Sequence, residues 1–161
     1  MIKAMEEKSD EEWLRDLRDM ADYQFGKGAG EGLFTGEIRI ERSRTGRARQ
    51  IHSKENYIAT HTKGGRLSLW IEGGERIIKS IEFPAYRVVV GEESEEYVRK
   101  GKNAFAKFVI DVDPDIRPKD EVVVVGEDGH LLAVGRAKMS ANAMLEFNRG
   151  VAVKVKEGQL Q

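Results

Sequence analysis

The chain has 161 residues, of which 40% are hydrophobic and 34% are charged, so it is long enough for one domain or two small ones with a real core. It contains no cysteine, which excludes disulfides, thiolate nucleophiles and cysteine-ligated metals, and its three histidines make any metal or cofactor site unexpected. No apolar run approaches the ~20 residues of a membrane span and the first residues lack a signal-peptide core, so we expect a cytoplasmic protein without membrane contact.

The net charge of −1 conceals an uneven distribution along the chain. Residues 1–35 carry five Lys/Arg against nine Asp/Glu, whereas residues 36–66 carry eight against three. A near-neutral total is therefore compatible with a local basic face.

Residues 9–25 predict the first helix. Ser9 or Asp10 can accept from first-turn amides, and the carboxylates that follow suit the positive helix start. One stripe at helical spacing is apolar and is expected to pack on the core; it consists of Trp13, Leu14, Leu17, Met20 and Ala21. The glycine-rich stretch 25–36 that follows fits neither a Walker loop nor a dinucleotide turn, which favours helix termination and positive φ before a strand.

From residue 37 to residue 81 the hydrophobic pattern alternates with a period of two. The clearest alternating runs are residues 37–41, 57–60, 66–71 and 76–81, and the turn signals between them are residues 43–46, 63–65 and 73–74. This pattern predicts an antiparallel meander of four or five strands with one face on the first helix. A domain boundary is expected near Phe83-Pro84, which gives domains of residues 1–82 and 83–161.

The second half predicts a strand-rich unit with two short helices. The expected strands are residues 86–90, 103–110, 121–125, 130–134 and 151–155, and the expected helices are residues 92–99 and 141–147, the latter capped by Ser140. An open sheet of these lengths would leave unpaired edges, so partial closure into a barrel is expected. The acidic turn at residues 111–115 lacks the length and the final Glu of a calcium loop.

Several pieces of this second half carry a family resemblance. They are Val98–Gly101, Phe105–Val109, Ile116–Val122, Ala133–Ala137, Met139-Ser140 and Arg149–Val153. In this order they resemble the PUA domain, a small β-barrel RNA-binding module. One departure is Lys119, where the family usually has glycine before the aspartate.

The first half resembles the domain that precedes PUA in archaeal tRNA-guanine transglycosylases and archaeosine synthases. The matching stretches are Ala21–Gly32, Ser43–Ile51 and Pro84–Val88. The resemblance implies an α+β protein in which an N-terminal helix packed on an antiparallel sheet precedes a PUA-type pseudo-barrel of mostly antiparallel strands. In those families catalysis resides in a separate large barrel-type domain, so no catalytic residues are expected here.

The PUA resemblance also implies an RNA surface at the helix-to-strand corner and the last strand. On this sequence it falls on Gly101, Lys102, Asn103, Lys107 and Lys154. A glycine lets a phosphate approach the backbone, but a plain glycine helix cap flanked by solvated lysines is the alternative.

Further cations lie outside that corner. Arg136 and Lys138 end one expected strand, where Arg136 could instead pair with Asp120 or Glu121. In the loop of residues 42–49, unpaired arginines would form a phosphate clamp, for which the candidates are Arg44, Arg47 and Arg49. The alternative for this loop is ion pairing with the acidic N-terminal segment.

These observations predict a non-catalytic RNA-binding protein that recognises tRNA, as an accessory or stand-alone module in archaeal tRNA modification. The alternative is a docking subunit for a catalytic tRNA-modifying chain, with little RNA affinity of its own. An enzyme with an unrecognised site is the third hypothesis.

Overall fold

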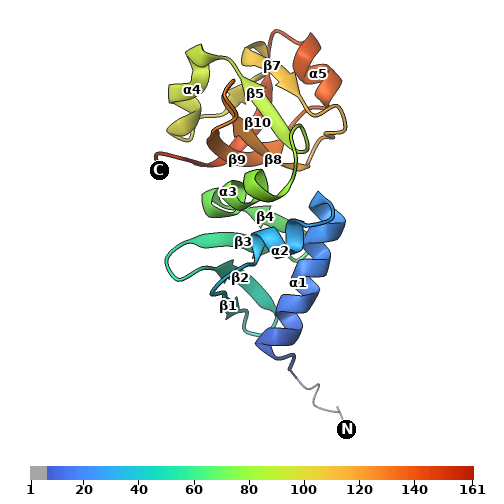
Figure 1. Ribbon diagram of the computed structural model, residues 1–161. Coiled ribbons are helices and arrows are strands. Elements are labelled where there is room, and N and C mark those ends of the chain that lie inside the picture. Colours follow the sequence, from blue (N-terminus) through green and yellow to red (C-terminus); the bar gives the residue numbers. More distant parts are fainter. Residues whose placement is uncertain (1–6) are drawn as a thin grey trace.

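The computed structural model describes residues 7–161, which form two units stacked on each other (Figure 1). The first unit contains α1 (Asp10–Phe25), α2 (Ala29–Leu33), β1 (Arg39–Arg42), β2 (Ala48–His52), β3 (Tyr57–His61), β4 (Leu67–Leu69) and α3 (Ile71–Ser80). Its strands form an antiparallel sheet in the order β1-β2-β3-β4. The predicted antiparallel meander is therefore confirmed, with strands at three of the four alternating runs, while β2 lies outside those runs.

Helix α1 begins with the predicted cap. Ser9 Oγ accepts from the Glu12 amide at 3.2 Å, and the Glu12 side chain reaches back to the Ser9 amide, which satisfies two groups that a helix start leaves unpaired. The apolar stripe packs against the sheet, with Leu17 and Ala21 fully buried. On the sheet side, Ile51, Ala59 and Leu69 lie in register and face the same core.

The strand predicted at residues 76–81 is wrong, because this stretch belongs to helix α3. Gly73 and Gly74, which were expected to form a turn, instead let α3 pack closely against β3 on one side and against the second unit on the other. A Cβ on Gly73 would lie 2.2 Å from Ile58 O of β3, and one on Gly74 would lie 2.5 Å from Val134 Cγ1 of the second unit. Helix α3 therefore lies between the two sheets, as Figure 1 shows.

The glycine-rich stretch also differs in part from the expectation. Gly26, Gly28 and Gly36 have positive φ, as predicted. However, the short helix α2 forms inside the stretch before the first strand, and a Cβ on Gly30 would lie 2.3 Å from Arg18 O. This glycine serves the close contact between α1 and α2.

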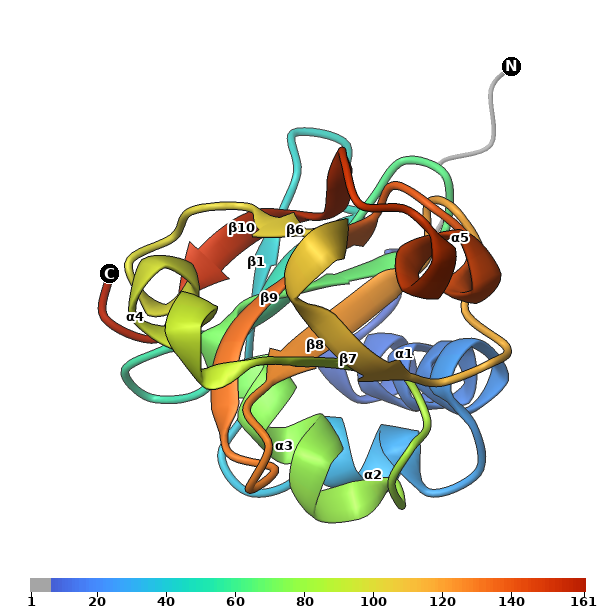
Figure 2. The same ribbon diagram turned by 90° about the horizontal axis from the view of Figure 1, so that it is seen from above.

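The second unit is a nearly closed pseudo-barrel of six strands in the order β6-β10-β9-β8-β5-β7, in which β5 and β8 are parallel. It contains β5 (Arg87–Val90), α4 (Glu92–Arg99), β6 (Ala104–Phe105), a 3-10 turn (Ala106–Phe108), β7 (Val109–Val112), β8 (Glu121–Val125), β9 (Leu131–Ala137), α5 (Ala141–Glu146) and β10 (Val151–Gly158). Helices α4 and α5 lie on opposite sides of it (Figure 2).

Helix α4 and strand β8 have the predicted bounds, and Ser140 Oγ accepts from the Ala143 amide as expected for a cap. The single strand predicted at residues 103–110 is wrong, since the 3-10 turn divides it into β6 and β7. This turn joins the two outermost strands and bends the sheet toward closure. Side chains of the second unit, among them Val123 and Val134, belong to the core of the first; the division at residue 82 stays a prediction.

Candidate nucleic-acid interface

Strand pairing in the pseudo-barrel brings distant charged residues into one row. Arg136 of β9 lies opposite Lys154 of β10 on one side and Glu121 of β8 on the other. Lys138, just beyond β9, is held beside β10 because its amide donates to Ala152 O at 2.8 Å. A groove of about 320 Å³ follows this row, and we call it the basic groove after its cations Arg136, Lys138, Lys154 and Lys156.

Two backbone features shape the basic groove. A Cβ on Gly135 would lie 2.3 Å from Lys154 O, so only glycine lets β10 approach β9 this closely. The register of β10 then shifts between Val155 and Glu157, which leaves Lys156 as an extra residue. Such bulges re-aim side chains, and Lys156 reaches the first unit, where Nζ donates to Ser68 Oγ at 2.7 Å.

Glu121 is the carboxylate of this groove, and it is buried. It accepts from the Leu69 amide of β4 at 3.1 Å and from Arg136 Nε at 3.3 Å. The predicted pairing of Arg136 with a neighbouring carboxylate is thus present with Glu121. Even so, 56% of the Arg136 side chain stays exposed, so the guanidinium can hold the carboxylate and still meet a ligand.

Lys156 was not among the residues predicted from the sequence. Its ammonium lies 3.8 Å from the centroid of the Trp70 ring, and burial lowers its pKa to about 8, against the opposing influence of Glu121 and Glu157. The alternating valines and lysines of residues 153–156 were the available signal. They indicated a strand, but the pattern did not show that a bulge would direct this lysine toward the groove.

The predicted helix-to-strand corner adjoins the same strand. The Gly101 amide donates to Val98 O and the Lys102 amide to Tyr97 O, which makes Gly101 the positive-φ residue of a helix cap. Both amides are therefore already hydrogen-bonded within the protein and do not face a phosphate unpaired. Asn103 Oδ1 accepts from the Val155 amide at 3.0 Å, so the corner is tied to β10 beside Lys154. Lys102 and Lys107 are exposed.

The arginine hairpin, residues 42–49, has two kinds of arginine. Arg42 donates to Asp10 at 2.6 Å, which is the predicted pairing with the acidic N-terminal segment, and Arg47 donates to His61 O at 2.9 Å and to Thr62 O at 3.3 Å. The side chains of Arg44 and Arg49 are exposed and make no hydrogen bond or ion pair with other side chains or backbone atoms of residues 7–161. The hairpin therefore does not present all its arginines to one ligand.

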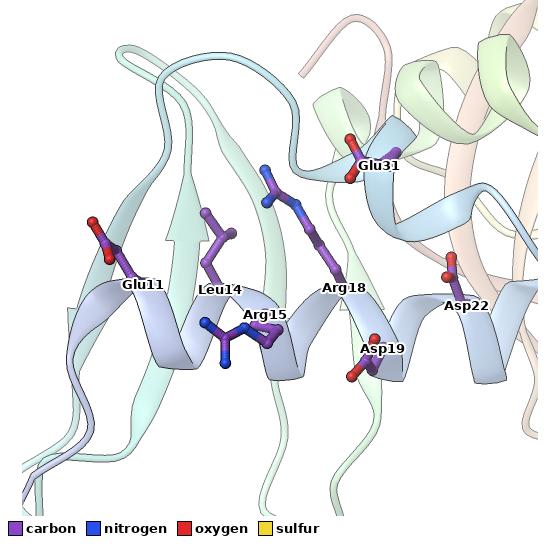
Figure 3. Close-up of a pocket in the computed structure, with 7 residues that line it drawn as sticks. All are labelled: Glu11, Leu14, Arg15, Arg18, Asp19, Asp22 and Glu31. Atoms are coloured by element: carbon purple, nitrogen blue, oxygen red, sulfur yellow. The ribbon is translucent and has the colours of Figure 1, made fainter.

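A second hollow, of about 390 Å³, lies between α1 and α2. Figure 3 shows Arg18 extending from α1 toward the chain around α2, where Glu31 lies. Arg18 donates to Phe34 O at 2.6 Å, and Asp22 accepts from the Gly30 amide at 2.8 Å. Because carboxylates outnumber cations here, this hollow does not suit a polyanion. Its charged residues are Glu11, Arg15, Arg18, Asp19, Asp22 and Glu31.

Metal binding, membrane spanning and the acidic turn are the remaining candidate features of residues 7–161. These residues contain no cluster of three or more His, Asp or Glu side chains placed to hold a metal ion. No helix among them is long and apolar enough to cross a membrane. Asp113 of the acidic turn is buried and accepts from the amides of Tyr86 and Asp115, so it stabilises the turn.

Two family models match the chain. Residues 15–84 match the patch-forming domain C2 of tRNA-guanine transglycosylase, and residues 86–158 match the PUA domain. Among solved structures, a hypothetical protein from Pyrococcus horikoshii covers 95% of this chain and 93% of its own with a TM-score of 0.67 at 22% identity. A conserved PUA domain protein from Thermoplasma acidophilum has a TM-score of 0.66 at 21% identity, and the match covers 94% of this chain and 91% of that protein. At these identities the likeness shows the fold.

Curated relatives are closer in sequence but much longer. The tRNA-guanine(15) transglycosylase of Methanothermobacter thermautotrophicus is 51% identical over 147 residues, which are 90% of this chain and 22% of the relative. The enzyme of the same name from Pyrococcus abyssi is 45% identical over 156 residues, which are 96% of this chain and 26% of the relative. The chain thus spans about a quarter of the length of these relatives. It consists of a patch-forming domain C2 and a PUA domain, and it is homologous to the C-terminal part of archaeal tRNA-guanine(15) transglycosylases.

Proposed function

We propose that the chain is a non-catalytic RNA-binding protein that recognises tRNA in archaeal tRNA modification. The observation that carries the proposal is the basic groove, where Arg136, Lys138, Lys154 and Lys156 converge around one carboxylate, Glu121, that is already hydrogen-bonded. RNA affinity comes largely from cations that meet phosphates. A row of cations along paired strands suits a backbone of regularly spaced phosphates.

The homologous enzymes support tRNA as the RNA in question, since their names state that they act on tRNA. This chain is similar to about a quarter of their length, and that quarter consists of the patch-forming and PUA domains. We propose that these two domains bind tRNA for a modification reaction whose catalytic residues lie outside them.

The proposed RNA surface runs from the basic groove along β10 to the helix-to-strand corner. In the corner, Lys102 and Lys107 would meet phosphates, while Gly101 and Asn103 shape the backbone beside them. Arg44 and Arg49 are outlying contacts. Arg47 stays a prediction as an RNA contact, although its guanidinium has partners within the fold.

Salt dependence tests this function. Replacing Lys138 and Lys154 together by alanine should weaken tRNA binding about 10-fold at moderate salt and lower the slope of log affinity against log salt by roughly 1.5. Lys79→Ala, which removes an exposed charge at the far end of α3, is the matched control and should leave both nearly unchanged. Absence of salt-dependent tRNA binding by the wild-type chain would contradict the proposal.

A docking subunit is the second candidate, and the hollow between α1 and α2 is the observation that favours it. Its excess of carboxylates suits a basic surface on a catalytic partner. Replacing Glu11 and Asp19 by lysine should abolish co-purification with an archaeal catalytic transglycosylase chain and leave tRNA binding intact. Co-purification that is unaffected by this reversal of charge would argue against the docking role of the hollow.

A further inference from the structure

The outer face of the four-stranded sheet, opposite the face that α1 covers, is lined with polar and aromatic groups. Cross-strand pairing aligns Gln50, Thr60 and Ser68 on this face. The same pairing places His52 beside Tyr57 at the end of the β2–β3 hairpin. One face of an antiparallel sheet is commonly open to solvent, and here Gln50 and Thr60 are only partly buried.

Three aromatic rings follow one another across this face, and we call His52, Tyr57 and Trp70 the aromatic row. The ring centroids of His52 and Tyr57 are 5.5 Å apart, and those of Tyr57 and Trp70 are 6.0 Å apart. Trp70 Nε1 donates to Thr60 Oγ1 at 3.0 Å, which fixes the indole. Tyr57 remains 49% exposed, so its ring is a pre-positioned surface that solvent covers.

A hollow of about 490 Å³ adjoins Tyr57 and Trp70. Its remaining walls come from the start of α3, the β2–β3 hairpin and the end of the chain. The hairpin and the chain end lie on the same side of the molecule (Figure 1). The polar groups there are carboxylates and amides, which can hydrogen-bond the edge of a nucleobase; the carboxylates would repel a phosphate. They are Glu55, Asn56, Glu72, Glu157, Gln159 and Gln161.

One side chain, Lys156, lies between this hollow and the basic groove. Lys156 lines the groove, stacks its ammonium over Trp70 and bonds to Ser68 on the outer face of the sheet. Cations thus lie on one side of Trp70 and neutral or acidic acceptors on the other. That division matches a nucleotide, which has an anionic phosphate at one end and a flat, hydrogen-bonding base at the other.

We infer that the aromatic row binds an unpaired nucleotide of the RNA, whose base stacks on Tyr57 beside Trp70 while its phosphate lies on the basic groove. The inference rests on the proposed function and extends it to the patch-forming domain. Every base has a π-face, so stacking on an aromatic ring tolerates different sequences. The carboxylates around the hollow add a preference for base edges that carry N–H donors.

Binding of tRNA and of a short single-stranded oligoadenylate by ring variants tests the inference. Tyr57→Ala should weaken both about 5- to 20-fold, because stacking on the ring is lost, and should leave the salt slope unchanged, because no phosphate contact is removed. Tyr57→Phe, which keeps the ring and loses the bond to Glu41, should restore affinity to within about 2-fold of wild type. Tyr23→Ala is the matched control, since Tyr23 is 94% exposed on α1, on the other side of the sheet.

Fluorescence of Trp70 gives a second measurement that does not depend on affinity. The chain has two tryptophans, so in a Trp13→Phe background the emission reports Trp70 alone. Oligoadenylate should quench this emission, and Tyr57→Ala should reduce the quenching at equal saturation.

The two proposals fail in different ways. If wild type binds tRNA with a steep salt dependence and Tyr57→Ala binds equally well, the aromatic row is not a nucleotide site, and the proposed function stands. A loss of salt slope in Tyr57→Ala would likewise overturn the inference, because the variant would then act through the cations. If wild type shows no salt-dependent binding, the proposed function itself is overturned.

Discussion

The arginine hairpin and the basic groove both concentrate cations, but they use them differently. In the hairpin, Arg42 and Arg47 donate to Asp10 and to the His61 and Thr62 carbonyls, so two of its arginines hold the fold together. In the basic groove, strand pairing places Arg136 and Lys154 side by side with much of their side chains exposed. A high local density of arginine in the sequence therefore does not by itself place free cations on one surface.

The difference follows from backbone geometry. Charges close together in a hairpin can fold back onto neighbouring carbonyls, whereas side chains on adjacent strands of a sheet stand roughly perpendicular to it and stay apart from their own backbone. The cross-strand row in the groove also keeps a fixed spacing of about 5 Å between neighbours. Fixed spacing means that little conformational entropy is lost when an extended polyanion binds.

Gly135→Ala should have the largest effect on the basic groove. The new Cβ would meet Lys154 O of β10 at 2.3 Å, so the strand has to shift, and we expect a loss of about 2 to 3 kcal/mol in the free energy of unfolding. Because the shift separates Arg136 from Lys154, tRNA affinity should also fall. Denaturant unfolding and tRNA titration of the same preparation measure both effects.

Gly64→Ala is the control for this substitution. Its Cβ would come no closer than 3.9 Å to another group, and it lies in a turn of the first unit. If Gly135→Ala unfolds at the same denaturant concentration as Gly64→Ala, the close approach of β10 to β9 does not constrain the groove.

Variants of the arginine hairpin separate the arginines that stabilise the fold from those that are free. Arg47→Ala removes two hydrogen bonds from a charged donor to part-buried carbonyls, so the free energy of unfolding should fall by about 1 to 2 kcal/mol. Arg44→Ala should change it by no more than about 0.5 kcal/mol, since Arg44 is exposed.

Replacing Arg44 and Arg49 together should weaken tRNA binding about 2- to 4-fold, which is less than the loss expected for Lys138 and Lys154. Salt titrations of the two double variants allow the comparison. A larger loss of slope in the hairpin variant would reverse the order of importance of the two clusters.

Much of the fold could be predicted from the sequence, because local signals and tertiary packing agree there. Ser9 and Ser140 cap helices as their positions indicate, and α4 ends at Arg99, two residues before the positive-φ Gly101. Helix α3 could not be predicted, because its isoleucines also fit an alternating strand and because Gly73 and Gly74 are poor helix formers. Their role becomes visible only when Ile58 and Val134 are known to lie against them.

The candidate site could be predicted only in part for a similar reason. Arg136, Lys138 and Lys154 were identified, but their convergence depends on a register that one sequence does not specify. Lys156 was missed because its direction depends on a bulge. The aromatic row was missed because His52, Tyr57 and Trp70 come from separate segments and meet only through pairing of β2 and β3 and the turn after β4.

The pH dependence of RNA binding should show a smaller effect, through the charge of Lys156 in the basic groove. The pKa of Lys156 lies at about 8, so its charge is lost as the pH rises through that value. The charged groups that face it are Glu121 of β8, Glu157 of β10 and Arg136 of β9. If Lys156 meets a phosphate, tRNA affinity at constant ionic strength should fall about 2- to 4-fold from about pH 7 to about pH 9.

Lys156→Arg provides the comparison, because arginine keeps its charge throughout this range. Its affinity should vary little with pH. Identical profiles for the two proteins would mean that the dependence arises elsewhere, either in another side chain or in the RNA.

The smallest expected effect concerns the stability of the hairpin side. His61 is buried beside Arg47, and burial, with the nearby charges of Arg47 and Lys8, lowers its pKa below 6.5. The unfolded chain therefore binds a proton more readily than the folded one as the pH falls below 6.5. As the pH falls from about 6.5 to the pKa of His61 in the folded chain, the free energy of unfolding should decrease by about 1 kcal/mol or less. Below that pKa it should level off.

His61→Asn isolates this contribution. Nδ1 of His61 donates to Ala48 O at 2.8 Å, because a carbonyl can only accept, and the amide nitrogen of asparagine can occupy nearly the same place without titrating. The difference in free energy of unfolding between wild type and variant should thus be constant above about pH 7 and shrink as the pH is lowered. The basic groove contains no histidine, so its tRNA affinity should not follow this transition. A difference that stays constant with pH would mean that His61 titrates in the folded chain as it does in the unfolded one.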